Sequence, residues 1–137
     1  METKYSLGIL GLGVMGRSLA QNFADLWEVS LTLDIQEGLE KLTTEVEQAY
    51  YRVAQEALDN IARHAEAHAA ALSLTRAGSR LTLTVSDDGR GIASGADFGD
   101  DHFGIQGMRE RAALIGGMLE IEAHPGQGTM LRLTTKM

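Results

Sequence analysis

Hydrophobic and polar residues alternate in five stretches of the chain, a pattern typical of half-buried β-strands. In the first, Trp27–Ile35, the apolar residues Val29, Leu31 and Leu33 fall on one face. The other four stretches are 72–75, 80–87, 118–124 and 129–135. Turn residues separate 72–75 from 80–87, and others separate 118–124 from 129–135. The pattern therefore predicts two hairpins and a mostly antiparallel sheet.

Two further stretches carry apolar residues at helical spacing. The first runs over 44–65, and Thr44 with Glu47 forms a capping-box signature at its start. The second begins near Gly104, and Gly116–Gly117 ends it. Helices between strands of such a sheet predict an α+β fold: a two-layer α/β sandwich with a mixed, mostly antiparallel sheet of about five strands and the helices on one face.

The segment 88–104 has five glycines, and its apolar residues follow neither the strand spacing nor the helix spacing. A loop of that length in a small domain is usually functional or disordered, and we interpret it as a mobile lid.

Composition narrows the class of protein. The 137 residues are 44% hydrophobic and include one proline and no cysteine, which indicates one soluble globular domain without thiol chemistry. The net charge of −7 disfavours a nucleic-acid partner. No stretch is typical of a signal peptide or a membrane span, so we expect a cytoplasmic domain with no membrane contact.

Glu56 and Asn60 are four residues apart on the first helix and therefore share a face. Asn60 falls at the edge of the apolar stripe, where its amide oxygen would suit Mg²⁺, an ion that takes few protein ligands and keeps water and phosphate oxygens. A solvated helix flank is the simpler interpretation of this pair alone.

Asp87 ends the alternating stretch 80–87 and is followed by Gly89 and Gly91. A carboxylate there would accept a hydrogen bond from the amino group of adenine, whereas guanine presents an oxygen at that position. A turn rich in Asp and Gly explains the same residues without a ligand.

The second helix opens with Gly104 and Gly107 directly after the loop, so its free N–H groups would suit phosphates. Arg109 and Arg111 follow, and for at least one of them an exposed helix face is the expected environment.

The order of these motifs is more specific than any one of them. Glu56-x-x-x-Asn60, Asp87-x-Gly89-x-Gly91, Gly104-x-x-Gly107 and Gly126-x-Gly128-Thr129 follow one another along the chain. Residues 27–137 thereby resemble the catalytic ATP-binding domain of sensor histidine kinases, which has the Bergerat fold of the gyrase and histidine-kinase superfamily. The sequences YYRVAQEALDNIARHA and FGIQGMRERAALIGG resemble the subgroup of nitrate and sugar-phosphate sensors.

This resemblance implies ATP and Mg²⁺ as ligands. Asn60 would bind the Mg²⁺ between the phosphates, Glu56 would orient a water or the second shell of the metal, and Asp87 would receive the adenine amino group. The other implied contacts are Gly89 and Gly91 at the adenine pocket, Gly104 and Gly107 at the phosphate end, Thr129 beside the adenine, and Arg63 and His64 toward the phosphates. His64 lies near the middle of the apolar stripe, so a core histidine is an equal alternative.

The resemblance also implies a histidine on a separate dimerisation domain as phosphoryl acceptor, and a response regulator as partner of the parent protein. In such kinases an acidic residue follows the acceptor. Here the four histidines precede Ala65, Ala69, Phe103 and Pro125. We therefore expect a domain that binds ATP but does not phosphorylate itself, or a non-catalytic module that kept the fold without ATP affinity.

Residues 1–26 carry a different pattern. Gly11-x-Gly13-x-x-Gly16 follows an apolar run, and Asp34 comes 18 residues later, as in a dinucleotide-binding fingerprint. This stretch resembles the start of 6-phosphogluconate dehydrogenase. It predicts either a helix preceding the kinase-like domain, a foreign leader joined to it, or, as a third function, NAD(P) binding.

Overall fold

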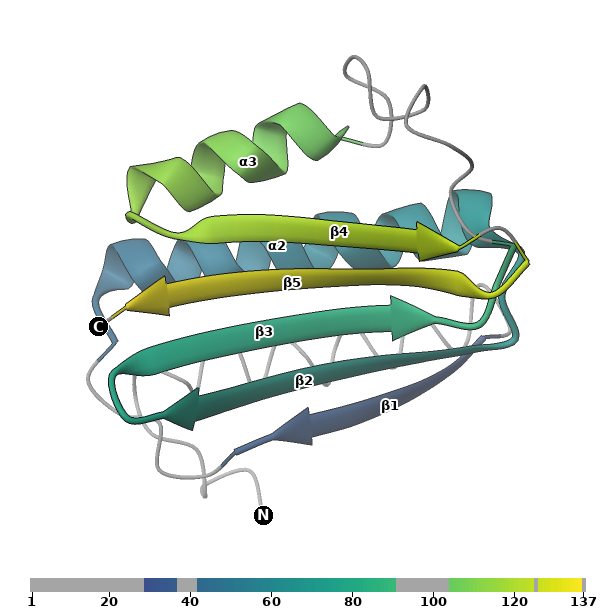
Figure 1. Cartoon of the computed structure of the whole chain (residues 1–137), viewed down its shortest axis with the longest axis horizontal. Helices are drawn as coiled ribbons and strands as arrows, with labels where there is room; N and C mark the ends of the chain where they lie inside the picture. Colours follow the sequence, from purple (N-terminus) through teal and green to yellow (C-terminus); the bar gives the residue numbers. More distant parts are fainter. Residues whose placement is uncertain (1–28, 37–41, 91–103, 125, 137) are drawn as a thin grey trace.

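The computed structural model describes residues 29–36, 42–90, 104–124 and 126–136. Five strands form one sheet in the order β1-β2-β3-β5-β4 (Figure 1). β1 pairs with β2 in parallel, and every other neighbouring pair is antiparallel. The strands are β1 (Ser30–Ile35), β2 (Ala69–Ala77), β3 (Arg80–Asp87), β4 (Met118–His124) and β5 (Gly128–Lys136).

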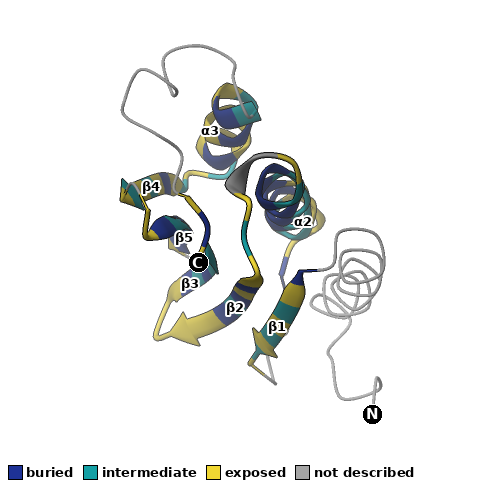
Figure 2. Ribbon diagram, turned by 90° about the vertical axis from the view of Figure 1, so that its right-hand side faces the viewer, coloured by how far each residue is buried: buried dark blue, intermediate teal, exposed yellow. Residues whose placement is uncertain are grey.

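Two helices, α2 (Thr44–Asn60) and α3 (Ile105–Leu114), cover the same face of the sheet (Figure 2). α2 continues into a π-helical turn, Ile61–Ala65. The α+β sandwich and its mostly antiparallel sheet are thus confirmed, as are both hairpins.

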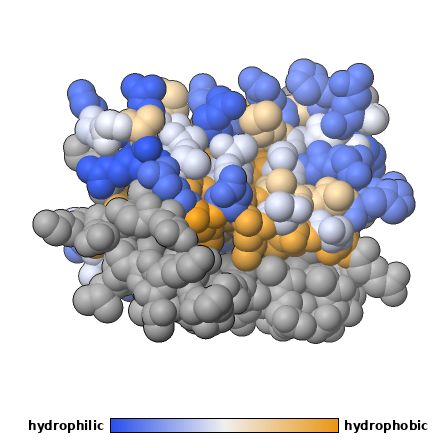
Figure 3. Space-filling model, turned by 90° about the horizontal axis from the view of Figure 1, so that it is seen from below, coloured by the Kyte–Doolittle hydropathy of each residue, from blue (hydrophilic) through white to orange (hydrophobic). Residues whose placement is uncertain are grey.

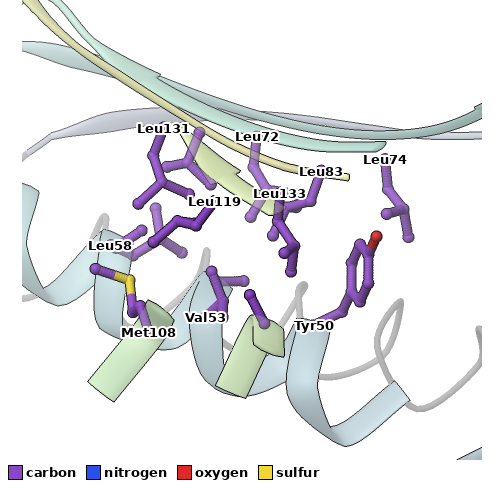
Figure 4. Close-up of a cluster of buried hydrophobic side chains, with 14 of the residues drawn as sticks. Tyr50, Val53, Leu58, Leu72, Leu74, Leu83, Met108, Leu119, Leu131 and Leu133 are labelled. Atoms are coloured by element: carbon purple, nitrogen blue, oxygen red, sulfur yellow. The ribbon is translucent and has the colours of Figure 1, made fainter. Parts of the chain in front are cut away.

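The core lies between the helices and the sheet. On β3 the inward residues Leu81, Leu83 and Val85 are at most 2% exposed, and they alternate with half-buried Thr82 and Thr84. α2 adds Tyr50 and Val53, and α3 adds Met108, all packed against strand leucines (Figure 4). Burying each such aliphatic side chain contributes roughly 1.5–3 kcal/mol, which fixes both helices on this face.

A buried polar pair joins the N-terminal half of α2 to β5. The Tyr50 hydroxyl donates to the carbonyl oxygen of Leu81 at 2.9 Å and lies 2.7 Å from Thr135 Oγ1 on β5. Burial raises the pKa of Tyr50 to about 12, while the Thr135 hydrogen bond acts in the opposite direction. Both hydroxyls are therefore satisfied inside the core.

β1 forms one edge of the sheet. Its residues Leu31, Leu33 and Ile35 are half-buried and alternate with exposed polar residues, as predicted. Seen from this edge, apolar residues gather in a band below a polar surface (Figure 3). β1 therefore has one row of side chains packed toward the helix layer and one row facing water.

The start of α2 differs from the prediction by one residue. Thr43, not Thr44, is the N-cap: its backbone is extended, and its side chain accepts from Val46 N at 3.2 Å. Two adjacent threonines offer the same cap chemistry, and only the backbone decides between them. Glu47 consequently lies one residue beyond the position of a capping box.

Several predictions fall outside the described residues. They concern the 1–26 segment with Gly11, Gly13 and Gly16, Gly91, and most of the proposed lid, 91–103. Among the described residues, no helix is long and apolar enough to cross a membrane.

Candidate functional site

Asn60, at the C-terminal end of α2, lines a small hollow between that helix and the sheet. Its side chain is largely buried, with 8% relative exposure for the residue. Thr129, near the start of β5, lines the same hollow, which has about 30 Å³ of free space. The remaining walls are apolar: Ala57, Ile61, Val85, Ile105, Ile121 and Leu131. Asn60 and Thr129 thus lie together at the border of an apolar space.

Glu56 lines a second, more polar cleft between α2 and α3. Gly104 and Gly107, at the start of α3, line it too, and its volume is about 340 Å³. A Cβ on Gly104 would lie 2.5 Å from Glu56 Oε2, and its φ is +67°. The positive φ favours glycine at this position, and a larger residue would also require the Glu56 carboxylate to move. Because Ile105 lines the hollow at Asn60, the start of α3 borders both spaces.

Asp87 ends β3 beside this hollow. Its Oδ1 accepts from Gly89 N at 2.7 Å. Burial raises the pKa of Asp87, and the charge of Asp88 adds to this, while hydrogen bonds from the backbone of Gly89 and Thr129 lower it. Thr129 connects the Asp87 carboxylate to the hollow lined by Asn60. The half-buried carboxylate is a hydrogen-bond acceptor held at a fixed place.

Asp88 has a different role from its neighbour. Its Oδ1 accepts from the backbone N–H groups of His68 at 2.9 Å and Ala69 at 3.0 Å. These two hydrogen bonds, Ala69 first, hold the pKa of the Asp88 carboxyl below its usual value. Asp88 thereby ties the end of β3 to the start of β2.

The turn between β4 and β5 packs closely against the backbone at and after Asp87. A Cβ on Gly128, whose φ is +95°, would overlap the carbonyl oxygen of Asp87. Gly126 N donates to Arg90 O at 2.7 Å. The motif Gly126-x-Gly128-Thr129 is therefore a hairpin turn and also a support for the backbone at Asp87.

Two other predicted residues, Arg63 and Arg109, have partners outside these two spaces. Arg63 forms an exposed i,i+4 ion pair with Asp59 at 3.2 Å. Arg109 donates to the carbonyl oxygen of Leu119 at 3.2 Å, so it joins α3 to β4. His64 lies in the π-helical turn, and its side chain is outside the described part of the chain.

Sequence reasoning assigned no role to Asp88, and it placed Gly128 only in the turn motif before Thr129. The backbone groups that Asp88 binds are about 20 residues away in the sequence. The overlap at Gly128 depends equally on a neighbouring strand. No local signal in the sequence reports either contact.

The fold and the site can now be compared with those of known protein families. The chain belongs to the Histidine kinase-, DNA gyrase B-, and HSP90-like ATPase family, whose model matches residues 45–137. It is similar to the Oxygen sensor histidine kinase NreB of Staphylococcus carnosus, with 31% identity over 93% of this chain and 37% of the relative. It is also 33% identical to the Sensor histidine kinase MctS of Rhizobium johnstonii, over 93% of this chain and 28% of the relative. The chain thus spans about a third of the length of these relatives.

Solved structures agree on the fold. The histidine kinase domain of the blue-light activated histidine kinase of Erythrobacter litoralis superposes with a TM-score of 0.79 at 21% identity, over 95% of this chain and 60% of that one. The resemblance to the ATPase domain of sensor histidine kinases is therefore confirmed, and the family implies ATP binding. The subgroup and the dehydrogenase-like start stay predictions.

Proposed function

We propose that this chain is the Mg-ATP-binding catalytic domain of a two-component sensor histidine kinase. It would supply ATP for phosphoryl transfer to a histidine on a separate dimerisation domain, from which a response regulator takes the phosphoryl group. The observation that carries the proposal is the meeting of two spaces at the C-terminal end of α2: an apolar hollow at Asn60 and a polar cleft at Glu56.

The apolar hollow suits the adenine. Its walls are mainly aliphatic, and Asp87 beside it offers a half-buried acceptor for the exocyclic amino group. Guanine would place an oxygen against that acceptor, so adenine is preferred. The free space of about 30 Å³ holds roughly one water. Adenine is larger, so its entry requires the lining side chains to move apart.

The donor set at Asn60 suits Mg²⁺ held jointly with a nucleotide. Among the described residues, no group of three or more His, Asp or Glu side chains could hold a metal by itself. Mg²⁺ commonly takes one or two protein oxygens and completes its octahedron with water and phosphate. Asn60 would be the protein ligand, and Glu56, one turn earlier, would orient a water near the metal.

The cleft at Glu56 suits the phosphates. The first N–H groups of α3 have no partner within the helix, and Gly104 and Gly107 leave them accessible to an anion. Bound ATP would supply the γ-phosphoryl group, and the residues of this chain would position and shield it. Arg63 and His64 are proposed to approach the phosphates, for which Arg63 would leave Asp59.

The test is a calorimetric titration with a non-hydrolysable ATP analogue and Mg²⁺, beside the matching GTP and NADP⁺ compounds. We expect binding of the ATP analogue alone, weakened more than about thirtyfold by Asn60→Ala, which removes the proposed ligand oxygen, and by Asp87→Asn, which replaces the charged acceptor by a neutral amide that also presents a donor. Matched controls are Gln48→Ala, an exposed amide on α2, and Asp34→Asn, an exposed aspartate on β1. Unchanged affinity in both site variants would sink the proposal.

The alternatives have their own outcomes in this experiment. A folded chain that binds no nucleotide is the non-catalytic module. Binding of NADP⁺ that is lost in Gly13→Ala or in Asp34→Asn would favour the dinucleotide fingerprint instead.

A further inference from the structure

Asp88 lies between the Asp87 carboxylate and the N–H group of Gly89 that orients it. Gly89 N donates to Asp87 Oδ1 at 2.7 Å, so the two peptide units around Asp88 fix the geometry of this contact. Asp87 is half-buried and is the last residue of β3, where the regular strand ends. The direction of its side chain therefore depends in part on how firmly the chain is held at Asp88.

Asp88 is held to the start of β2 by three hydrogen bonds. Its N–H donates to the carbonyl oxygen of Ala69 at 3.2 Å, and its Oδ1 accepts from His68 N at 2.9 Å and Ala69 N at 3.0 Å. The carbonyl oxygen of His68 in turn accepts from Ser30 N at 3.0 Å, at the start of β1. One carboxylate oxygen thus joins the end of β3 to the place where β1 and β2 begin.

The turn between β4 and β5 holds the same segment from another side. Gly126 N donates to Arg90 O at 2.7 Å, and a Cβ on Gly128 would lie 3.2 Å from Asp88 Cα. The segment after Asp87 is therefore held between the start of β2 and this turn. The Asp88 side chain supplies two of the contacts, and a substitution can remove them without altering the main chain.

We propose that Asp88 is a positioning residue for the nucleotide site: its two side-chain hydrogen bonds hold Asp87 where it accepts from the adenine amino group. The inference rests on the proposed function and names a residue that sets its base selectivity. A cap that only stabilises the strand end is the simpler role for Asp88. A cap changes the fraction of folded molecules, whereas a positioning residue changes how well the folded molecules distinguish one base from another.

A charge effect of Asp88 on Asp87 is a separate route. Burial is the main cause of the raised pKa of Asp87, and the charge of Asp88 adds to it. Two variants separate charge from geometry. Asp88→Asn keeps an oxygen at the Oδ1 position and removes the charge, whereas Asp88→Glu keeps the charge and moves the carboxylate by one methylene. The proposal requires that Asn can replace Asp88 and that Glu cannot.

The experiment measures the affinity of the whole chain for two ligands by calorimetry, at neutral pH with Mg²⁺. One is the non-hydrolysable ATP analogue, and the other is the same compound with unsubstituted purine, which lacks only the amino group. The wild-type chain should bind the ATP analogue about tenfold or more tighter. This ratio should fall to about threefold or less in Asp88→Ala and Asp88→Glu, and it should stay within about twofold of the wild-type value in Asp88→Asn.

Tyr50→Phe is the control, because it removes a buried hydroxyl that contacts Leu81 near the opposite end of β3. It should keep the wild-type ratio. Urea unfolding of each variant gives its folded fraction, and affinities are expressed per folded molecule. Where Asp88→Ala does not fold, Asp88→Asn and Asp88→Glu decide between the outcomes.

The outcomes separate this inference from the proposed function. A ratio in Asp88→Ala and Asp88→Glu equal to that of the wild type, and well above one, would overturn the inference alone. A ratio lost in Asp88→Asn and kept in Asp88→Glu would assign the effect to charge and also overturn it. Equal affinity of the wild type for the two ligands would remove its premise, the acceptor role of Asp87. No binding of either ligand by the folded wild-type chain would overturn the proposed function itself.

Discussion

α2 buries one polar side chain in its N-terminal half and another at its C-terminal end, but the two places differ in the space beside that group. In the N-terminal half, the Tyr50 hydroxyl contacts Leu81 and Thr135, and all three residues are at most 3% exposed. At the C-terminal end, Asn60 and Thr129 border a hollow. We call the enclosed place at Tyr50 and Thr135 the closed end, and the place at Asn60 and Thr129 beside the hollow the open end.

The difference separates residues that are enclosed by the core from residues that border a space beside it. The Tyr50 hydroxyl has its hydrogen bonds within the protein, and no hollow lined by Tyr50 lies among the spaces described above. At the open end, a half-buried carboxylate and an amide lie at the edge of apolar walls. If this division holds, changes at the closed end affect stability alone, and changes at the open end also affect binding.

Gly128→Ala should have the largest effect, because it damages the open end through the backbone. The new Cβ would overlap the Asp87 carbonyl oxygen at a φ of +95°. We expect a loss of about 3 kcal/mol or more in the free energy of unfolding, measured with urea. The control is Gly126→Ala: its φ is +79°, but no atom of a described residue lies within 4 Å of the added Cβ. It should cost about 1–2 kcal/mol, and equal losses in the two variants would contradict the steric explanation.

Tyr50→Phe should lower the stability without affecting the open end. Removing the hydroxyl leaves the Leu81 carbonyl and the Thr135 hydroxyl without this buried partner, at a cost of about 1–2 kcal/mol. Urea unfolding measures the loss, and calorimetry measures the affinity for the ATP analogue. A change in affinity beyond about twofold would show that the two ends are coupled.

The pH dependence of stability should differ in sign between the adjacent aspartates. Burial raises the pKa of Asp87 above 3.8 in the folded state, so its contribution to stability falls as the pH rises from 3.8 through the folded pKa. The pKa of Asp88 lies below 3.8, so its contribution is present above 3.8 and is lost as the pH falls through the folded pKa.

Urea midpoints at several pH values test this pair. The free energy of unfolding of each variant is compared with that of the wild-type chain at the same pH. For Asp87→Asn this difference should become more favourable as the pH rises from 3.8 through the folded pKa of Asp87, because only the wild type loses stability there. For Asp88→Asn it should become less favourable as the pH rises from the folded pKa of Asp88 to 3.8, because only the wild type gains stability there. Equal slopes for the two variants would mean that the carboxylates have similar environments.

Arg63→Gln should have the smallest effect. The Arg63–Asp59 pair is exposed, with side-chain exposures of 60% and 40%, so its loss should cost about 0.5 kcal/mol or less. Thermal unfolding measures this difference. A parallel fall in affinity for the ATP analogue would mean that Arg63 leaves Asp59 for the phosphates.

The local patterns predicted the elements well. Strands 80–87 and 118–124 have the expected bounds, because alternation and flanking glycines mark both ends of each strand. The N-cap was wrong by one residue, since Thr43 and Thr44 carry the same side chain. The π-helical turn after Asn60 was not predicted, because no residue in IARHA marks the change from an α-helix.

The site was predicted in part. Placing Glu56 and Asn60 on one side of a helix needs only its period, and the structure puts them at adjoining spaces. Their proposed roles stay predictions. The hydrogen bonds of Asp88 to the start of β2 and the need for glycine at 128 both depend on contacts between strands. The sheet sets these contacts, and the local sequence does not report them.

The strand order also sets how long different amides keep their hydrogens in deuterated water. β3 is the middle strand, with β2 and β5 bonded on its two sides, whereas β1 has a described neighbour on one side only. Amides of β3 should exchange only when the whole molecule unfolds, and those of β1 through local opening. Asp87 is the last residue of β3, so the carboxylate proposed to select adenine is attached to the strand that opens most rarely.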